Sequence, residues 1–200
     1  MRHLILVLGD QLDAKSAAFD DFQKQQDAVW MVEVKAEAEH VWSHKARIAI
    51  FLAAMRHFRD ELRKRDITVH YRQLDDAGNQ GDFAAELKAA VRKHKPRRLI
   101  VVQPGEYRVQ EQLQQAADAV NCEIEIRPDR HFYSTPDDFV EHARGRKQLR
   151  LEYFYRELRK QHDVLMEGDK PVGGDWNYDS DNRHSFSKDG TADLPAPPNF

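Results

Sequence analysis

The stretch from His3 to Leu8, HLILVL, followed directly by Gly9-Asp10, indicates the fold of the chain. A short apolar run that ends at a glycine and an acid is typical of a strand buried on both faces of a parallel sheet. A second run of this kind, AVWMVEV from Ala28 to Val34, follows after a polar stretch. Both runs predict strands of a buried sheet.

Strand and helix patterns alternate after these two runs. The clearest helix is predicted at about 43–65, where apolar residues recur at spacings of three and four: Ile48, Phe51, Leu52, Met55, Phe58 and Leu62. Further strands are predicted at 67–74, 99–102 and 124–126, and further helices at 84–95 and 109–120. Because such alternation favours right-handed crossovers, we predict a Rossmann-like α/β domain over about residues 1–130, with a parallel five-stranded sheet and helices on both faces.

The rest of the chain is expected to differ from this domain. Helices are predicted at 136–143 and 146–161, so that residues 131–167 form a helical connector. Residues 168–200 carry six acids and three bases, are rich in proline and glycine, and show no helical or alternating apolar pattern. We predict a linker or extended tail there, leading toward a further domain.

One segment, from Arg144 to Lys160, is clearly basic. It contains seven bases and two acids, interleaved with the aromatic residues Tyr153, Phe154 and Tyr155. Such a surface could contact nucleic acid. The simpler interpretation, a solvated basic helix face beside an aromatic core edge, is favoured because charged helix faces are common.

Composition excludes several classes of protein. The 200 residues carry a formal net charge of −3, which excludes a generally basic coat for nucleic acid. Mean hydropathy is −0.78, and no apolar stretch approaches the ~20 residues of a membrane span. The single cysteine, Cys122, cannot form an internal disulfide or supply an iron–sulfur cluster, and we expect it in the core. These features predict a soluble, cytoplasmic protein with no membrane partner.

Acidic residues follow the predicted strands, at the sheet edge where open parallel sheets bind ligands. They are Asp10, Glu33, Glu37, Asp75, Asp76 and Glu106. So many acceptors disfavour a phosphate-rich ligand, and no glycine-rich phosphate-binding motif is present. A neutral heterocycle or polyol with N–H and O–H donors fits better. The alternative, that these acids cap the next helix, is favoured for Asp75 and Asp76 and is equally good for Asp10 and Glu33.

His40, Trp42 and His44 form a small cluster at the start of the long predicted helix. The two histidines are four residues apart and could place two metal ligands on one helix face, but no third ligand is evident. We therefore predict no metal here and favour polar lining of a ligand pocket, with Ser43 as the helix cap. Cys122 has no basic neighbour that would make it a nucleophile.

Five separated motifs together resemble one known family. They are LVLGDQL at 6–12, HVWSHKARIAIFLAAMRHF at 40–58, PGEYRV at 104–109, GRKQLRLEYFYRELR at 145–159 and GGDWNYDSDNR at 173–183. The resemblance is to the photolyase-related branch of the cryptochrome/photolyase superfamily, the bacterial (6-4) photolyase and cryptochrome group that carries an iron–sulfur cluster. It runs nearly end to end, but it covers only the N-terminal part of such a protein.

The resemblance implies an antenna domain that binds 6,7-dimethyl-8-ribityllumazine and passes excitation to a flavin. By position in the motifs, the residues expected at this chromophore are Gly9, Asp10, Gln11, Glu33, Glu37, His44 and Ile48. FAD, the 4Fe-4S cluster and the damaged DNA belong to a large helical domain that this chain does not include. No catalysis is therefore expected from this chain alone, and DNA is expected as a partner only of the full-length protein.

Three alternatives stay open at this point. Asp175, Asp179 and Asp181 could recruit Mg²⁺ near DNA phosphates, although Asx turns in a linker are the favoured interpretation. The aromatic residues of the basic segment could leave apolar surface that a homodimer covers. The chain could also be a free-standing α/β enzyme that binds a nucleotide or another small ligand, or an interaction module without a ligand.

Overall fold

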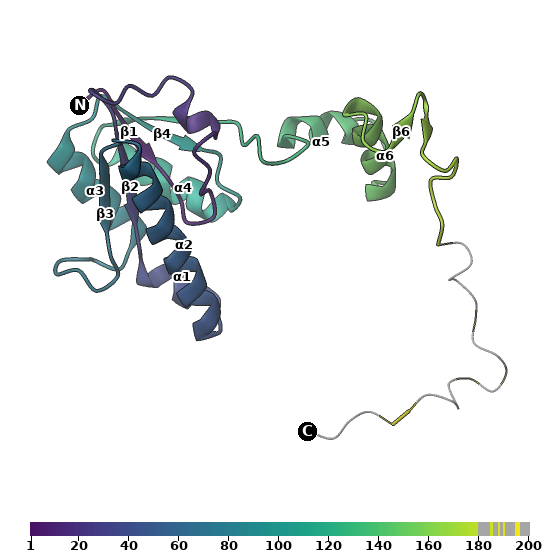
Figure 1. The fold of residues 1–200 in the computed structure, drawn as a ribbon, viewed down its shortest axis with the longest axis horizontal. Helices are drawn as coiled ribbons and strands as arrows, with labels where there is room; N and C mark the ends of the chain where they lie inside the picture. Colours follow the sequence, from purple (N-terminus) through teal and green to yellow (C-terminus); the bar gives the residue numbers. More distant parts are fainter. Residues whose placement is uncertain (180–184, 186–187, 189, 191–194, 197–200) are drawn as a thin grey trace. The chain divides into compact units, whose positions relative to one another are not determined.

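Figure 1 shows the computed structural model, which describes residues 1–179, 185, 188, 190, 195 and 196. The chain divides into two compact units, the first being Met1–Thr135 and the second beginning at Pro136. The first unit contains the predicted Rossmann-like domain.

Five parallel strands form the sheet of the first unit, in the order β3-β2-β1-β4-β5 (Figure 1). Their bounds are His3–Leu6 for β1, Ala28–Val32 for β2, Val69–Arg72 for β3, Arg98–Val102 for β4 and Glu123–Arg127 for β5. In the central strand, Leu4 pairs with Ala28 on one side and with Leu99 on the other. The chain runs outward from β1 to β3 and then returns to the other side of β1, so the strand order reverses between β1 and β4.

Helices cover both faces of this sheet, as predicted. The helices of the first unit are α1 at Lys35–His40, α2 at Lys45–Lys64, α3 at Phe83–His94 and α4 at Tyr107–Asp118, with a 3₁₀ turn, η1, at Ala17–Phe19. Helices α3 and α4 pack on one face and α2 packs on the other.

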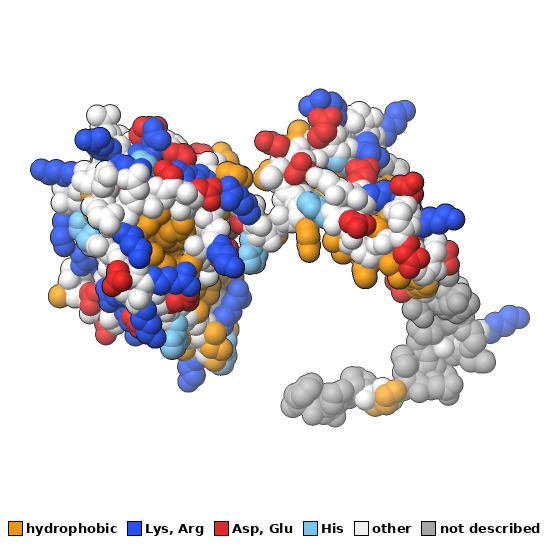
Figure 2. Space-filling model, turned by 45° about the horizontal axis from the view of Figure 1, so that its top comes forward, with side chains coloured by type: hydrophobic (Ala, Val, Ile, Leu, Met, Phe, Trp, Pro, Cys, Tyr) orange, Lys and Arg blue, Asp and Glu red, His pale blue; other side chains and the backbone are white. Residues whose placement is uncertain are grey.

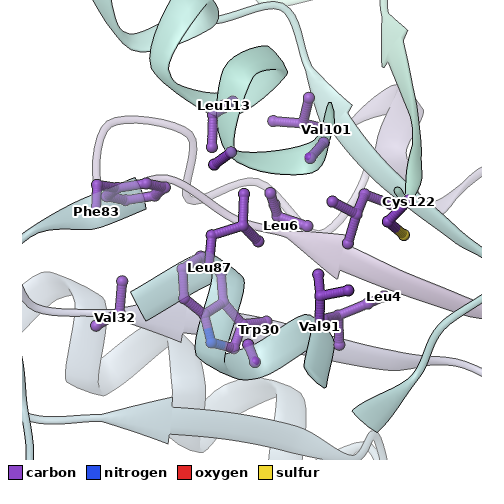
Figure 3. Close-up of a cluster of buried hydrophobic side chains, with 14 of the residues drawn as sticks. Leu4, Leu6, Trp30, Val32, Phe83, Leu87, Val91, Val101, Leu113 and Cys122 are labelled. Atoms are coloured by element: carbon purple, nitrogen blue, oxygen red, sulfur yellow. The ribbon is translucent and has the colours of Figure 1, made fainter. Parts of the chain in front are cut away.

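The core beneath α3 and α4 is shown in Figure 3. Leu6 of β1 and Leu87 of α3 are fully buried there, and the ring of Phe83 meets Trp30 edge-on with centroids 5.4 Å apart. Cys122 belongs to the same cluster, and burial raises the pKa of its thiol. The prediction that Cys122 is a core residue is confirmed.

Helix α2 is longer than the strands it covers. Phe58 and Leu62 in its second half are buried against Ile5 and Ile100 of the sheet, whereas Phe51 in its first half is 44% exposed. A 20-residue helix is about 30 Å long, while a five-residue strand spans about 17 Å. The first half of α2 therefore extends beyond the carboxyl ends of the strands.

The second unit is built from two helices and a small hairpin. Helices α5 and α6 span Pro136–Ala143 and Leu151–Gln161, and strands β6 and β7 span Met166–Glu167 and Lys170–Pro171. Phe154 of α6 is buried, with its ring 5.3 Å from that of Phe139 and 4.9 Å from that of His142. Of the three aromatic residues expected to leave exposed apolar surface, only Tyr153 and Tyr155 do so.

Three local predictions are wrong. The tail expected to lack regular structure begins with β7, because Gly168 takes a positive φ of 59° and allows a tight turn after β6. The cap of α2 is His44, whose Nδ1 accepts from the Ala46 N–H, and Ser43 is not the cap. Asp82, and neither Asp75 nor Asp76, caps α3.

Among the residues that the structure describes, no helix is both long enough and apolar enough to cross a bilayer.

A pair of stacked histidines lies between β3 and α3. The rings of His70 and His94 have centroids 3.8 Å apart. Burial and the nearby positive charges of His70, Lys93 and the N-terminus lower the pKa of His94 to about 4, and burial also lowers that of His70. The fold therefore favours two neutral rings.

Acidification is predicted to destabilise this unit through the histidine pair. An unfolded imidazole titrates at 6.5, whereas His94 stays neutral in the fold to about 4, so stability is full above the first value and falls toward the second. Urea unfolding at about pH 7 and about pH 5 should show a loss roughly 1 kcal/mol larger for the wild type than for His94→Asn, after allowing for solvent screening. Equal losses in the two proteins would contradict this account.

Candidate functional site

A cavity of about 440 Å³ lies beyond the carboxyl ends of β1, β2 and β4. Its floor comes from the residues that follow these strands, and its apolar wall comes from the first half of α2 with Ile48, Phe51, Leu52 and Met55. The start of α4 and the loop after α1 complete the lining. Figure 2 shows hydrophobic side chains gathered in one region of this unit, with charged side chains around them.

The close approach of α2 to the sheet edge depends on Gly9. A Cβ atom at this position would overlap the ring of Phe51 and lie 3.0 Å from Met55 Sδ. Only glycine lets these two side chains reach the backbone that follows β1. Gly9 thus shapes the cavity floor, where the sequence placed it.

The carboxylate of Glu33 is fully used by the protein. Its side chain is 0% exposed, and Oε1 accepts from Arg56 Nε at 2.7 Å and from the Tyr71 hydroxyl at 2.7 Å. Oε2 accepts from an Arg56 terminal nitrogen and from the Leu74 N–H, both at 2.8 Å. Burial alone would raise the pKa of Glu33, but these hydrogen bonds outweigh it and hold the pKa below its ordinary value. The expectation that Glu33 accepts directly from a ligand is therefore not supported.

Asp10 is the carboxylate that the cavity leaves open. Its side chain makes no ion pair with any described residue, and burial, with the charges of Glu106 and Glu37, raises its pKa. Across the cavity Arg108 binds Glu37 at 3.1 Å and Glu106 at 2.9 Å. The site thus presents one free acceptor and one pinned guanidinium against an apolar wall.

The predicted site residues divide between two places. Gly9, Asp10, Glu33, Glu37 and Ile48 line the cavity. His44 does not, because its ring is used to cap α2.

Gln11 also lies apart, in a second cavity beside the first. Sequence reasoning missed Arg108, although it belongs to the PGEYRV motif, and it missed Phe51 and Met55 as ligand-facing residues, although both lie in the apolar stripe of α2.

Comparison with known proteins gives the family. The chain matches the family model described as "Deoxyribodipyrimidine photo-lyase-related protein" over residues 5–200. The chain belongs to this photolyase-related family. A (6-4) photolyase of Agrobacterium fabrum (strain C58) is 45% identical over 189 residues, which are 94% of this chain and 37% of that protein. An uncharacterized protein of Acanthamoeba polyphaga mimivirus is 27% identical over 138 residues, 67% of this chain and 68% of its own length.

This photolyase-related chain therefore spans 37% of the curated photolyase that it matches. The family assignment confirms the resemblance carried by the five motifs, and the α/β unit with its cavity lies within the matched residues.

No group of three or more metal-ligating side chains is found among the residues that the structure describes in this photolyase-related chain. His40 lines the first cavity and His44 caps α2, so the pair does not converge on one point. Asp175 and Asp179 lie in the described part of the tail, and Asp181 lies outside the described residues.

The basic segment of the second unit pairs several of its charges internally. Arg146 binds Glu157 at 2.8 Å, and Arg156 is paired with Glu152. Arg159 lies 5.2 Å from the centre of the Trp176 ring. These contacts support the interpretation of a solvated, self-paired helix face.

Two acids that the sequence made equivalent are predicted to differ strongly in stability. Glu33→Ala should lower the free energy of unfolding by about 3 kcal/mol, because it leaves the Arg56 charge, the Tyr71 hydroxyl and the Leu74 N–H without their acceptor. Glu37→Ala, which removes an exposed ion pair with Arg108, is the matched control and should cost less than about 1 kcal/mol. Urea unfolding measures both, and similar values for the two variants would refute the structural role assigned to Glu33.

Proposed function

We propose that this chain is the light-harvesting domain of a photolyase-related flavoprotein, either a DNA-repair enzyme or a blue-light receptor. In this proposal the cavity beyond β1 and β2 binds a lumazine-type chromophore such as 6,7-dimethyl-8-ribityllumazine. The observation that carries the proposal is the position of the cavity. It lies where open parallel sheets bind ligands, next to the point where the strand order reverses, in a member of the photolyase-related family.

The lining suits an uncharged, flat heterocycle. Ile48, Phe51 and Leu52 offer an apolar wall on which a ring can pack. Opposite them, Asp10 can accept from a ring N–H, and Arg108 can donate to ring carbonyl oxygens. Small-molecule pockets measure roughly 300–1,000 Å³, so a volume of about 440 Å³ is sufficient for a bicyclic ring with a short substituent.

The remaining parts of the activity belong to a full-length protein in this proposal. Excitation collected in the first unit would pass to a flavin held by a further domain, where an iron–sulfur cluster and the DNA lesion would also bind. The chain contributes chromophore binding and orientation. It would perform no lyase reaction without that domain.

The proposal predicts a specific effect of filling the cavity from α2. Ile48→Trp should weaken lumazine binding about 10-fold or more, because the larger ring occupies the space of the chromophore. Ile50→Trp is the matched control, since Ile50 lies on the same helix, is 72% exposed and does not line the cavity, and its affinity should equal that of the wild type.

Fluorescence titration of 6,7-dimethyl-8-ribityllumazine measures these affinities, and circular dichroism verifies that both variants are folded. Failure of the folded wild-type chain to bind any lumazine, flavin, folate or deazaflavin would overturn the proposed function. Equal affinities for wild type and Ile48→Trp would show that the ring binds elsewhere.

A further inference from the structure

A second cavity, of about 340 Å³, lies on the opposite side of the point where the strand order reverses. It is bounded by the loop after β1, by the end of β4 and by the segment after β5. It shares Gly9, Asp10 and Gly105 with the first cavity. The two cavities therefore adjoin each other along the carboxyl edge of the sheet, and both lie within the first unit.

Gln11 gives this second cavity an acceptor without a donor. Its Nε2 donates to the carbonyl oxygens of Val102 at 3.2 Å and Gln103 at 2.9 Å, and these two bonds fix the orientation of the amide. Gln11 Oε1 is thereby directed away from β4. This oxygen is buried, and no described residue donates to it. Leaving a buried acceptor unpaired costs about 1–3 kcal/mol, so the position favours a ligand that supplies a donor.

The other polar groups of the second cavity are mostly acceptors as well. Asp10, Asp13 and Asp129 line it, and the one arginine there, Arg130, is held by Asp20 at 2.9 Å. Three carboxylates and an amide oxygen match hydroxyl groups. They oppose a phosphate, which would bring further negative charge to them.

The junction between the cavities is open because Gly105 has no side chain. A Cβ atom built there would meet nothing closer than Asp10 Oδ2 at 4.0 Å, and its backbone does not require glycine, since it is absent from the residues of positive φ. A flexible chain attached to a ring in the first cavity can pass over this glycine beside Asp10.

We propose that the two cavities form one two-part binding site, in which the second cavity holds the hydroxyl-rich, unphosphorylated chain of a ligand whose ring lies in the first. Gln11 Oε1 accepts from a chain hydroxyl, and the carboxylates accept from the others. This inference rests on the proposed function and names what that function does not, namely the part of the ligand that determines selectivity.

Three related ligands test the inference: 6,7-dimethyl-8-ribityllumazine, its 5′-phosphate, and 6,7,8-trimethyllumazine, which has the same ring without the chain. The wild-type chain should bind the ribityl compound about 10-fold or more tightly than the trimethyl compound, since each hydrogen bond contributes about 1 kcal/mol. The phosphate ester should bind about 10-fold or more weakly than the ribityl compound.

Two variants locate the effect. Ser16 lines only the second cavity and its hydroxyl makes no capping bond, so Ser16→Leu fills the far end of that cavity. This variant should bind the trimethyl compound as the wild type does and should lose the preference for the ribityl chain. Gly105→Val narrows the junction and should also lose the preference, which keeps the test available if Ser16→Leu does not fold. Ile48→Trp is the contrast, because it should weaken both compounds alike.

The outcomes separate this inference from the proposed function. Equal binding of the ribityl and trimethyl compounds by the wild type, or a preference that survives in folded Ser16→Leu and Gly105→Val, overturns the two-part site and leaves the lumazine-binding function standing. If the folded wild type binds neither compound, the proposed function fails and the two-part site fails with it.

Discussion

The buried carboxylate of Glu33 organises the edge of the sheet at which both cavities form. It directly follows β2, and its oxygens accept from Arg56 of α2, from Tyr71 of β3 and from the Leu74 N–H beyond β3. A carboxylate with 0% side-chain exposure is stable only when every lone pair is used, so the network sets the distance between α2 and the two strand ends. That distance determines how far the apolar half of α2 stands from the cavity floor.

Glycine gives this edge its second constraint. Gly9 admits Phe51 and Met55 against the backbone after β1, while Gly105 leaves the space beside Asp10 open. The reversal of strand order between β1 and β4 brings these two glycines to the same place. An apolar wall on one side and a group of acceptors on the other suit a ligand with two chemically different parts, and family membership supports a chromophore as that ligand.

The sequence predicts the architecture well because buried strands and the long amphipathic helix have strong periodicity. Helix α1 has no such signal, since KAEAEH contains no apolar stripe and forms a helix through its good intrinsic helix formers. Asp10 and Glu33 both follow strands and cannot be distinguished locally. Only the fold brings Arg56 to Glu33 and leaves Asp10 without a base. The same limit explains His44, whose ring caps its own helix, and Gln11, whose bonds to β4 depend on residues about ninety positions away.

The most direct measurement is a crystal structure of this chain soaked or co-crystallised with 6,7-dimethyl-8-ribityllumazine. The account predicts ring density packed on Ile48 and Phe51 above Gly9, with the ribityl chain crossing Gly105 toward Gln11. Density for the ring on the second unit, or at any other place on the first unit while the cavity beyond β1 and β2 holds only water, would contradict the central claim.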